Sequence, residues 1–272
     1  VWGSRIIPYR GSWLEFEIDQ KKELIYAKID RKKKILGTIF LRALGFESRE
    51  EIIKVFYQTE SLPVKNSNSG REAIVGKVLS KAIYIKDADS GEEKKLFKAA
   101  TRLHPHDIDD LIANGIKEIE AIKFDTRKDP DDKDEKNLSL DSDIIIKCFE
   151  REEIKFSKEG SEVDEPTKED ALSAVYSVLM PGEPITVENA EKDLNSLFFS
   201  PRRYDLGRVG RYKLNKKFDY NSEINDQTLI KDDITNTMKY LIKVYIGEES
   251  RDDIDHLGNR RIRSVGELMT NQ

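Results

Sequence analysis

The chain has 272 residues, of which 38% are hydrophobic and 36% are charged, and its formal net charge is −5. This length is sufficient for one large domain or for two ordinary domains, each with a hydrophobic core. No apolar run approaches the roughly 20 residues that a membrane-spanning helix requires, so the composition argues against an integral membrane protein. The single cysteine, Cys148, excludes an internal disulfide and fits a reducing cytoplasm, where we expect this protein to work.

The charges are distributed unevenly along the chain. Residues 200–217 carry seven Lys or Arg side chains against one acidic residue, whereas residues 129–135 carry five acidic residues against one basic residue. The negative net charge argues against a protein that coats nucleic acid without regard to sequence, because such proteins are normally basic overall. We therefore expect any contact with nucleic acid to be made by one face of the molecule.

The first part of the chain predicts strands followed by two helices. Residues 5–31 place apolar side chains among polar neighbours and contain a polar turn, which is typical of strands. Residues 35–44 carry apolar residues at helical spacing and end at Gly45, a residue type that commonly follows the last turn of a helix. Ser48 has the side chain of an N-cap, so a second helix is expected to begin there.

The middle of the chain differs from the parts that flank it. Residues 63–70 are rich in Asn and Ser and predict a flexible connection, and residues 107–113 predict a short helix. The apolar runs around that helix predict strands at residues 73–78, 82–85, 116–124 and 143–149. Loops bound the block on both sides, so we expect residues 63–155 to form an inserted small α/β subdomain with a core of its own.

The last third of the chain predicts mainly helices. Thr167 has the features of an N-cap, and Thr186 begins another helix with an apolar stripe. Residues 202–218 form a basic segment that is punctuated by glycine, and Asp232 begins a final helix that Gly247 ends. Strands near the start and helices toward the end predict the α+β class, as a mixed sheet with packed helices.

The segment 252–267 holds three aspartates, three arginines and one histidine in sixteen positions. Burying so many charges would cost more free energy than its few aliphatic residues return, so the segment is not a core element. Its apolar residues recur at intervals, which a floppy tail would lack. We interpret the segment as an ordered loop that is held against something polar.

The sequence of this segment, DDIDHLGNRRIRSVGE, closely resembles a signature of the beta subunit of bacterial DNA-dependent RNA polymerase. Further matches to that subunit occur upstream, in the order that the family has them and across almost the whole chain. They lie at residues 5–17, 29–31, 41–45, 181–184, 197–200, 203–206 and 209–211. Several matches in order are far more specific than one short motif.

The resemblance implies how the chain is organised. Residues 1–62 and 156–250 would form the second lobe of the beta subunit, which is one wall of the main cleft of the polymerase. Residues 63–155 would be an insertion that varies between lineages, and residues 251–272 would be a truncated return segment toward the neighbouring protrusion lobe. The chain begins at Val1 and not at an initiator methionine, so we expect an excised piece of a larger polypeptide that is monomeric by itself.

The resemblance also implies contacts with DNA from both ends of the chain. Trp13 matches the tryptophan that stacks on an unpaired base of the non-template strand, and an exposed indole suits this role because every base has a π-face. Asp255 and Arg260 match residues of a pocket for a flipped-out guanine of that strand, with Ile254 as an apolar wall. A carboxylate suits the N–H donors of guanine, and an arginine suits its acceptors or a phosphate.

Three basic residues complete the implied DNA-binding set. Arg203 matches an arginine that faces the cleft near the non-template strand, and Lys32 does so more weakly, because arginine is frequent at that family position. Arg263 is expected to face the cleft or to tie two lobes together. In one departure from the family, Met180 precedes Pro-Gly-Glu-Pro where some members carry arginine, which puts a phosphate contact there in doubt.

Catalysis is implied only for the whole polymerase, a nucleotidyltransferase. Nucleotidyl transfer by two metals requires clustered aspartates that hold Mg²⁺, and the family has that triad on the partner beta-prime subunit. We therefore expect neither catalytic residues, nor a bound metal, nor a cofactor in this chain, and the isolated chain should be inactive. The implied partners are the non-template strand and the downstream duplex of DNA, the rest of beta, and the beta-prime, alpha, omega and sigma subunits, at the nucleoid.

Reasoning from the residues alone leaves other interpretations open. Trp13 also fits a core position of a strand at residues 12–18. His104 and His106, with nearby carboxylates, suggest a freestanding metal-dependent enzyme, although a turn that enters a helix accounts for the same residues. A third interpretation is a protein-interaction module, in which the block 71–155 docks a transcription factor.

Overall fold

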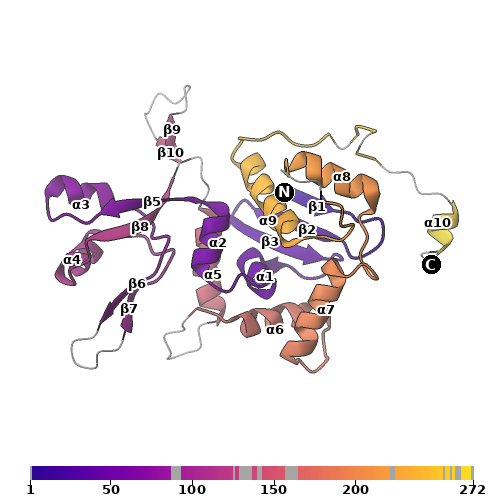
Figure 1. Cartoon of the computed structure of the whole chain (residues 1–272), viewed down its shortest axis with the longest axis horizontal. Coiled ribbons are helices and arrows are strands. Elements are labelled where there is room, and N and C mark those ends of the chain that lie inside the picture. Colours follow the sequence, from indigo (N-terminus) through magenta and orange to yellow (C-terminus); the bar gives the residue numbers. More distant parts are fainter. Residues whose placement is uncertain are drawn as a thin grey trace.

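The computed structural model describes residues 2–86, 93–124, 126–128, 137–139, 143–156, 165–220, 224–253, 255–257, 259–260 and 265–270. At its centre is a four-stranded sheet in the order β1-β2-β3-β4 (Figure 1). Its strands are β1 (Trp2–Ile6), β2 (Leu14–Asp19), β3 (Leu24–Ile29) and β4 (Ile35–Leu36). The strands that were predicted within residues 5–31 are confirmed.

The register of the sheet decides which loops meet at each end. β2 is paired on both sides, and its Leu14 stands opposite Ile6 of β1 and Ile29 of β3. At the other end of β2, Ile18 stands opposite Trp2. The loop before β2 and the turn after β3 therefore lie at the same end of the sheet, whereas Trp2 lies at the opposite end.

Helices cover the sheet and enclose the main core. They are α1 (Gly37–Ala43), α2 (Arg49–Phe56), α5 (Ile144–Phe156), α6 (Lys168–Leu179), α7 (Val187–Phe199), α8 (Gly207–Lys217) and α9 (Lys231–Tyr245). α1 and α5 pack against β3, α9 packs against β1, α6 packs on α1, and α7 packs on α6. The approach of α1 is close, since a Cβ on Gly37 would lie 2.8 Å from a side-chain carbon of Ile25. Within the described residues, no helix has the length and apolar character of a membrane span.

The predicted α+β class is confirmed, but two details differ. The described strands pair in antiparallel fashion throughout, whereas a mixed sheet was predicted. Residues 143–149 were predicted as a strand, and this is wrong because helix α5 runs through them. The run Ile144–Ile146 is β-branched, which favours a strand locally. The helical conformation is favoured because it buries Ile145, Cys148 and Phe149 together in the main core, at the spacing of one helical face.

Three other elements were missed or misplaced. The strand predicted at residues 73–78 is wrong, because α3 (Asn68–Ile74) occupies its start and the hydroxyl of Ser67 accepts the capping hydrogen bond of that helix. The basic segment 202–218 contains helix α8. A further helix, α10 (Val265–Thr270), follows the one that was predicted to be last.

A distal module, which we define as the described part of residues 58–123, stands apart from the main body in Figure 1. Its elements are β5 (Gln58–Pro63), α3, β6 (Ile83–Lys86), β7 (Glu93–Phe97), α4 (Pro105–Ala113) and β8 (Glu118–Lys123), and the short β9 (Thr126–Lys128) and β10 (Asn137–Ser139) follow. β5 pairs with β8, and a second hydrophobic cluster lies around them. α5 falls within the predicted insertion 63–155 yet packs in the main core, and the domain boundaries stay a prediction.

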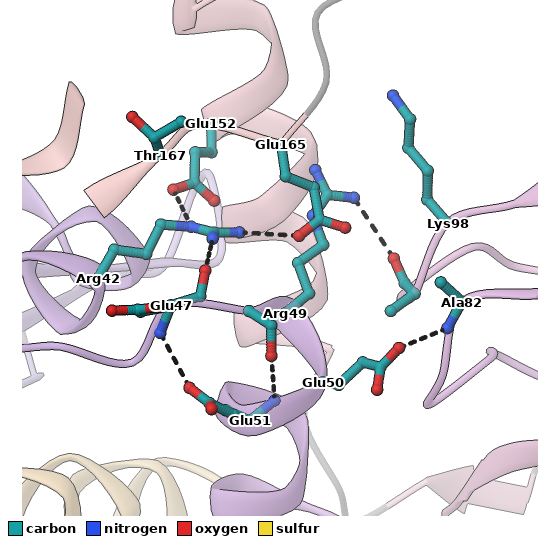
Figure 2. A network of polar contacts seen from close by, with 12 residues as sticks. Arg42, Glu47, Arg49, Glu50, Glu51, Ala82, Lys98, Glu152, Glu165 and Thr167 are labelled. Atoms are coloured by element: carbon teal, nitrogen blue, oxygen red, sulfur yellow. Dashed lines mark hydrogen bonds and ion pairs between the residues drawn. The ribbon is translucent and has the colours of Figure 1, made fainter. Parts of the chain in front are cut away.

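A network of charged side chains joins the distal module to the main body (Figure 2). Arg42 of α1 is fully buried, and its Nε lies 2.9 Å from Oε1 of Glu152 on α5. Burial raises the pKa of the Glu152 carboxyl, and the nearby guanidinium groups of Arg42 and Arg49 oppose that rise. Glu50 of α2 accepts a hydrogen bond of 3.0 Å from the backbone N–H of Ala82 in the distal module. The network holds α5 in the main core and fixes the base of the module.

Candidate nucleic-acid interface

Three loops meet at the end of the sheet where β2 begins. The loop before β2 is joined to the segment that follows α7, because the backbone N–H of Arg10 donates to the carbonyl of Asp205 at 3.0 Å and the reverse bond is 2.8 Å. The guanidinium of Arg10 also donates to the carbonyl of Pro201 at 3.0 Å. Segments almost two hundred positions apart in the sequence are thus brought side by side.

Gly11 allows this close approach. Its φ of +130° is a conformation that residues with a side chain rarely adopt. A Cβ at this position would lie 2.8 Å from the ring of Tyr204 and 3.0 Å from the carbonyl oxygen of Arg203. Tyr204 is itself fully buried, so it cannot move aside. The glycine therefore lets one loop lie against the segment that carries Arg203.

Trp13 lies in the same loop, just before β2, and its side chain is half-buried. Its backbone N–H donates to a carboxylate oxygen of Asp30 at 2.7 Å, and its carbonyl accepts from the N–H of Asp30 at 3.0 Å. The guanidinium carbon of Arg31 lies 5.3 Å from the centroid of the indole ring. Trp13 is thus outside the strand and outside the main core, which disfavours the interpretation of Trp13 as a core residue.

Lys32 and Arg203 are brought together by the fold, and their cleft role stays a prediction. They line one small hollow of about 50 Å³ between the turn after β3 and the ends of α6 and α7. The ammonium of Lys32 donates to the carbonyl of Leu179 at the end of α6. The guanidinium of Arg203 donates to the hydroxyl of Ser196 on α7 at 3.0 Å. These bonds hold both positive charges on the exposed rim, where an anion can reach them.

The positive charge at this end of the sheet comes from several segments. The three loops and the start of α8 carry eight exposed basic residues. Lys34 pairs with Glu17 at 2.8 Å, and the other seven are Arg10, Arg31, Lys32, Lys33, Arg202, Arg203 and Arg208. We call these seven, with Trp13, the cationic rim. Arg211, which the sequence counts with the basic segment 200–217, is excluded because it is buried and paired with Asp233 at 2.9 Å. The rim therefore contains only Arg202, Arg203 and Arg208 of the seven basic residues in segment 200–217, and its other four basic residues come from the loops before β2 and after β3.

The predicted guanine pocket is described only in part. Arg260 and Asp255 are both exposed and lie 3.8 Å apart, so the structure brings these two together. Ile254 and Arg263 lie outside the described residues. Upstream, the guanidinium of Arg251 lies 3.9 Å from the ring centroid of Trp2, at the end of the sheet opposite Trp13.

The described residues provide no contact between Trp13 and either Asp255 or Arg260. A shared site formed by the two ends of the chain therefore stays a prediction. The segment just before Asp255 is anchored by the contact of Arg251 with Trp2. This contact is distant from Trp13, because β2 separates the two ends of the sheet by roughly 17–20 Å.

The histidine pair forms a turn that enters a helix. His104 precedes α4, and its backbone N–H donates to a carboxylate oxygen of Asp107 at 2.7 Å. The rings of His104 and His106 are stacked with centroids 5.7 Å apart. In the part of the chain that the structure describes, no group of three or more His, Cys, Asp or Glu side chains is arranged to hold a metal ion. The helix-entry interpretation of these residues is confirmed.

Comparison with known proteins decides the family. The sequence profile of the family described as RNA polymerase Rpb2, domain 2, matches residues 1–87 and 137–263. The chain belongs to this family. It is 61% identical, over 99% of its length, to the DNA-directed RNA polymerase subunit beta of Treponema denticola. It is 57% identical to the subunit of that name from Treponema pallidum and 48% identical to that from Borreliella burgdorferi, over 100% of its length in each case.

The resemblance to the bacterial beta subunit is thereby confirmed over the whole chain. The Rpb2 domain 2 chain spans 22% of the length of each of these relatives. The two segments that match the family profile leave out residues 88–136, which lie inside the insertion predicted at 63–155.

Sequence reasoning missed part of the cationic rim of this Rpb2 domain 2 chain. Arg10 and Arg31 stand within the upstream motifs, but nothing in the local pattern shows which way their side chains point. The loop that carries Arg10 and the segment that carries Arg202 lie side by side because the backbone of Arg10 pairs with that of Asp205. Gly11 was the one available signal, because glycine is the usual residue where the backbone takes a positive φ or another segment approaches closely.

Proposed function

We propose that this chain forms a wall of the DNA cleft in the beta subunit of a bacterial RNA polymerase. It holds the unpaired non-template strand and the leading edge of the downstream duplex while the polymerase copies DNA into RNA. The observation that carries this proposal is the half-buried indole of Trp13 beside exposed cationic groups from three separate loops. Stacking surfaces interleaved with basic side chains are the usual means of holding single strands.

The cationic rim would bind DNA in two ways, by stacking on bases and by attracting phosphates. Trp13 supplies a flat surface that is worth about 1–3 kcal/mol for each stacked base, without preference for sequence. Arg203 and Lys32 supply positive charges for phosphates, so they position the strand and do not read it. Because the remaining surface is negative overall, the isolated chain should bind DNA weakly, and the rest of the polymerase completes the cleft.

The exposed Asp255 and Arg260 contribute the sequence preference in this proposal. Their opposite charges, 3.8 Å apart, offer an acceptor and donors to one base edge, which fits a flipped-out guanine of the non-template strand. Ile254 would close the pocket as an apolar wall, and Arg263 would face the cleft or tie two lobes together. The pocket needs other parts of beta for completion.

The chemistry of nucleotidyl transfer is assigned to the partner beta-prime subunit, which would hold the Mg²⁺ ions. This chain would carry no catalytic residue and no cofactor, and would be inactive alone. Its partners would be DNA, the rest of beta, and the beta-prime, alpha, omega and sigma subunits, at the nucleoid in the cytoplasm.

The proposal is tested with polymerase that carries substitutions in this part of beta, bound to DNA with a pre-melted bubble. Trp13→Ala should weaken binding roughly 5- to 150-fold, as the loss of one stacked base requires. Arg203→Ala should weaken binding evenly across sequences and lower the salt slope by about one unit. Lys22→Ala, an equal loss of charge at the far end of the sheet, is the matched control and should change little.

The pocket is tested separately in the same polymerase. Asp255→Ala should remove the preference for guanine at one non-template position while general transcription continues. An unchanged base preference would remove the pocket from the proposal. Unchanged binding in both Trp13→Ala and Arg203→Ala would overturn the proposed cleft role itself.

A further inference from the structure

The turn after β3 has a strained backbone. Asp30 and Arg31 have φ angles of +47° and +59°, and the N–H of Lys32 donates to the carbonyl of Ile29 at 2.9 Å. Two consecutive left-handed residues closed by such a bond are the features of a type I′ turn, which normally takes Asn-Gly. Aspartate tolerates this conformation, but arginine does so only with strain. Strain of this kind persists only where surrounding contacts hold it.

Contacts on both sides of the turn hold it in place. On one side, Asp30 binds the backbone of Trp13 twice, through its carboxylate at 2.7 Å and through its N–H at 3.0 Å. On the other side, the ammonium of Lys32 donates to the carbonyl of Leu179. These bonds tie the turn to the loop that carries Trp13 and to the end of α6.

The consequence of this strained turn is the position of Arg31. Its guanidinium carbon lies 5.3 Å from the centroid of the Trp13 ring, and the side chain is exposed. None of the ion pairs among the described residues involves Arg31. The planar guanidinium is therefore held over the indole, and its N–H groups donate no hydrogen bond to any other described residue.

We propose that Arg31 is the second plate of the stacking site, so that the unpaired base is held between the indole of Trp13 and the guanidinium of Arg31. This inference rests on the proposed function and adds to it a residue that positions the base. A base between two plates requires them to stand about 7 Å apart, which is twice the roughly 3.4 Å rise of stacked bases. The observed 5.3 Å is short of this by less than 2 Å, and a small rotation of an exposed arginine supplies the difference.

The chemistry of the two plates fits an unpaired base of any identity. Guanidinium groups stack on aromatic faces and are attracted to their π-electrons, and their donors remain available to a neighbouring phosphate. Lysine has the same charge, but it lacks the plane. The plane therefore distinguishes a stacking role from a simple attraction to phosphate.

The test uses polymerase that carries this chain in its beta subunit, bound to a pre-melted bubble with 2-aminopurine in the non-template strand. Stacking of 2-aminopurine on the indole quenches its emission. Arg31→Gly should weaken the quenched complex about two- to fivefold, the range expected for loss of an exposed cation–π contact. Arg31→Lys should weaken it as well, because lysine keeps the charge but lacks the plane. Lys22→Ala removes an exposed charge at the opposite end of the sheet and should leave quenching unchanged.

The variants separate stacking from a structural role of the turn. Glycine adopts positive φ without strain, so Arg31→Gly should keep or raise the melting temperature while it weakens quenching. In a Trp13→Ala background, Arg31→Gly should have no further effect on quenching. If Arg31→Lys shows the same quenching as the native polymerase, Arg31 is not a second stacking surface and acts only through its charge.

The two proposals fail in different ways. If Trp13→Ala relieves the quenching and the Arg31 variants do not, only the second plate is wrong and the cleft role stands. If Trp13→Ala also leaves the quenching unchanged, the indole is not the stacking surface and both proposals are overturned.

Discussion

Buried arginines show that the setting of a charge matters more than its presence in the sequence. Arg211 makes two parallel bonds to Asp233, at 3.0 and 2.9 Å, and it also donates to the carbonyl of Asp226 at 2.6 Å. Arg42 is likewise enclosed beside Glu152. Removing one partner of such a buried pair typically costs about 3–5 kcal/mol, because the other charge is left unpaired. These arginines hold elements together and are not available for the proposed contacts with DNA.

Cys148 provides a pH test at the residue scale. The thiol is fully buried on α5, and burial raises its pKa from 9.0 to about 12. Above pH 9 the unfolded chain loses this proton and the folded chain keeps it, so stability falls as pH rises toward 12. Between these values, the free energy of unfolding should fall by about 1.4 kcal/mol per pH unit relative to Cys148→Ala.

Urea unfolding of the native chain and of Cys148→Ala, at several pH values above and below 9, measures this difference. The comparison cancels the titration of lysines and tyrosines that both proteins share. A difference that is constant with pH would show that the thiol ionises as easily in the folded chain as in the unfolded one.

At the scale of elements, the capping of two neighbouring helices provides a matched pair. Thr167 begins α6, where its hydroxyl accepts from the N–H of Asp170 at 3.2 Å and the carboxylate of Asp170 accepts from the N–H of Thr167 at 3.0 Å. Thr186 begins α7 without any side-chain capping bond. The same residue type thus occupies the same position with and without the bond.

Thr167→Ala should lower the free energy of unfolding by about 1 kcal/mol, because one orphan donor at the helix start loses its partner. Thr186→Ala should cost much less. Thermal unfolding of the two variants under identical conditions measures the difference. Equal losses would mean that the hydroxyl of Thr167 contributes no capping energy. Because α6 supplies the carbonyl that binds Lys32, the cap also supports the cationic rim.

At the scale of the whole molecule, the distal module can be removed at a natural joint. Pro63 of β5 stands opposite Glu118 of β8, so a two-residue Asn-Gly turn can replace residues 64–117. A deletion that extended to Glu152 would take α5 out of the main core. The shorter deletion removes only Val78 and Ala99 from the buried residues of the main core. It should therefore keep one cooperative unfolding transition, and DNA binding by the assembled polymerase should stay within about twofold.

Circular dichroism during heating and binding to a pre-melted bubble check this expectation. Loss of DNA holding in a folded deletion variant would place part of the DNA contact in the distal module. If the deletion variant no longer binds a transcription factor but still binds DNA, the distal module has the docking role that the sequence left open.

The sequence alone was sufficient for features whose cause is local. Apolar spacing and capping residues predicted β2, β3, α1, α6, α7 and α9, because strand and helix periods and N-caps depend on neighbouring residues. The motifs from residue 5 to residue 267 were sufficient for the family, since several short matches in a set order are specific. The same motifs selected Trp13, Lys32 and Arg203.

Tertiary structure decided the features that depend on distant neighbours. Ile144–Ile146 became helical because β3 and α1 offered a core for one helical face. Arg211 is buried because it pairs with Asp233. Lys32 and Arg203 line the same hollow because the fold holds their two loops together. The left-handed turn at Arg31 exists because Asp30 binds the backbone of Trp13. Burial and pairing are properties of the partners that folding brings together, and no local pattern contains them.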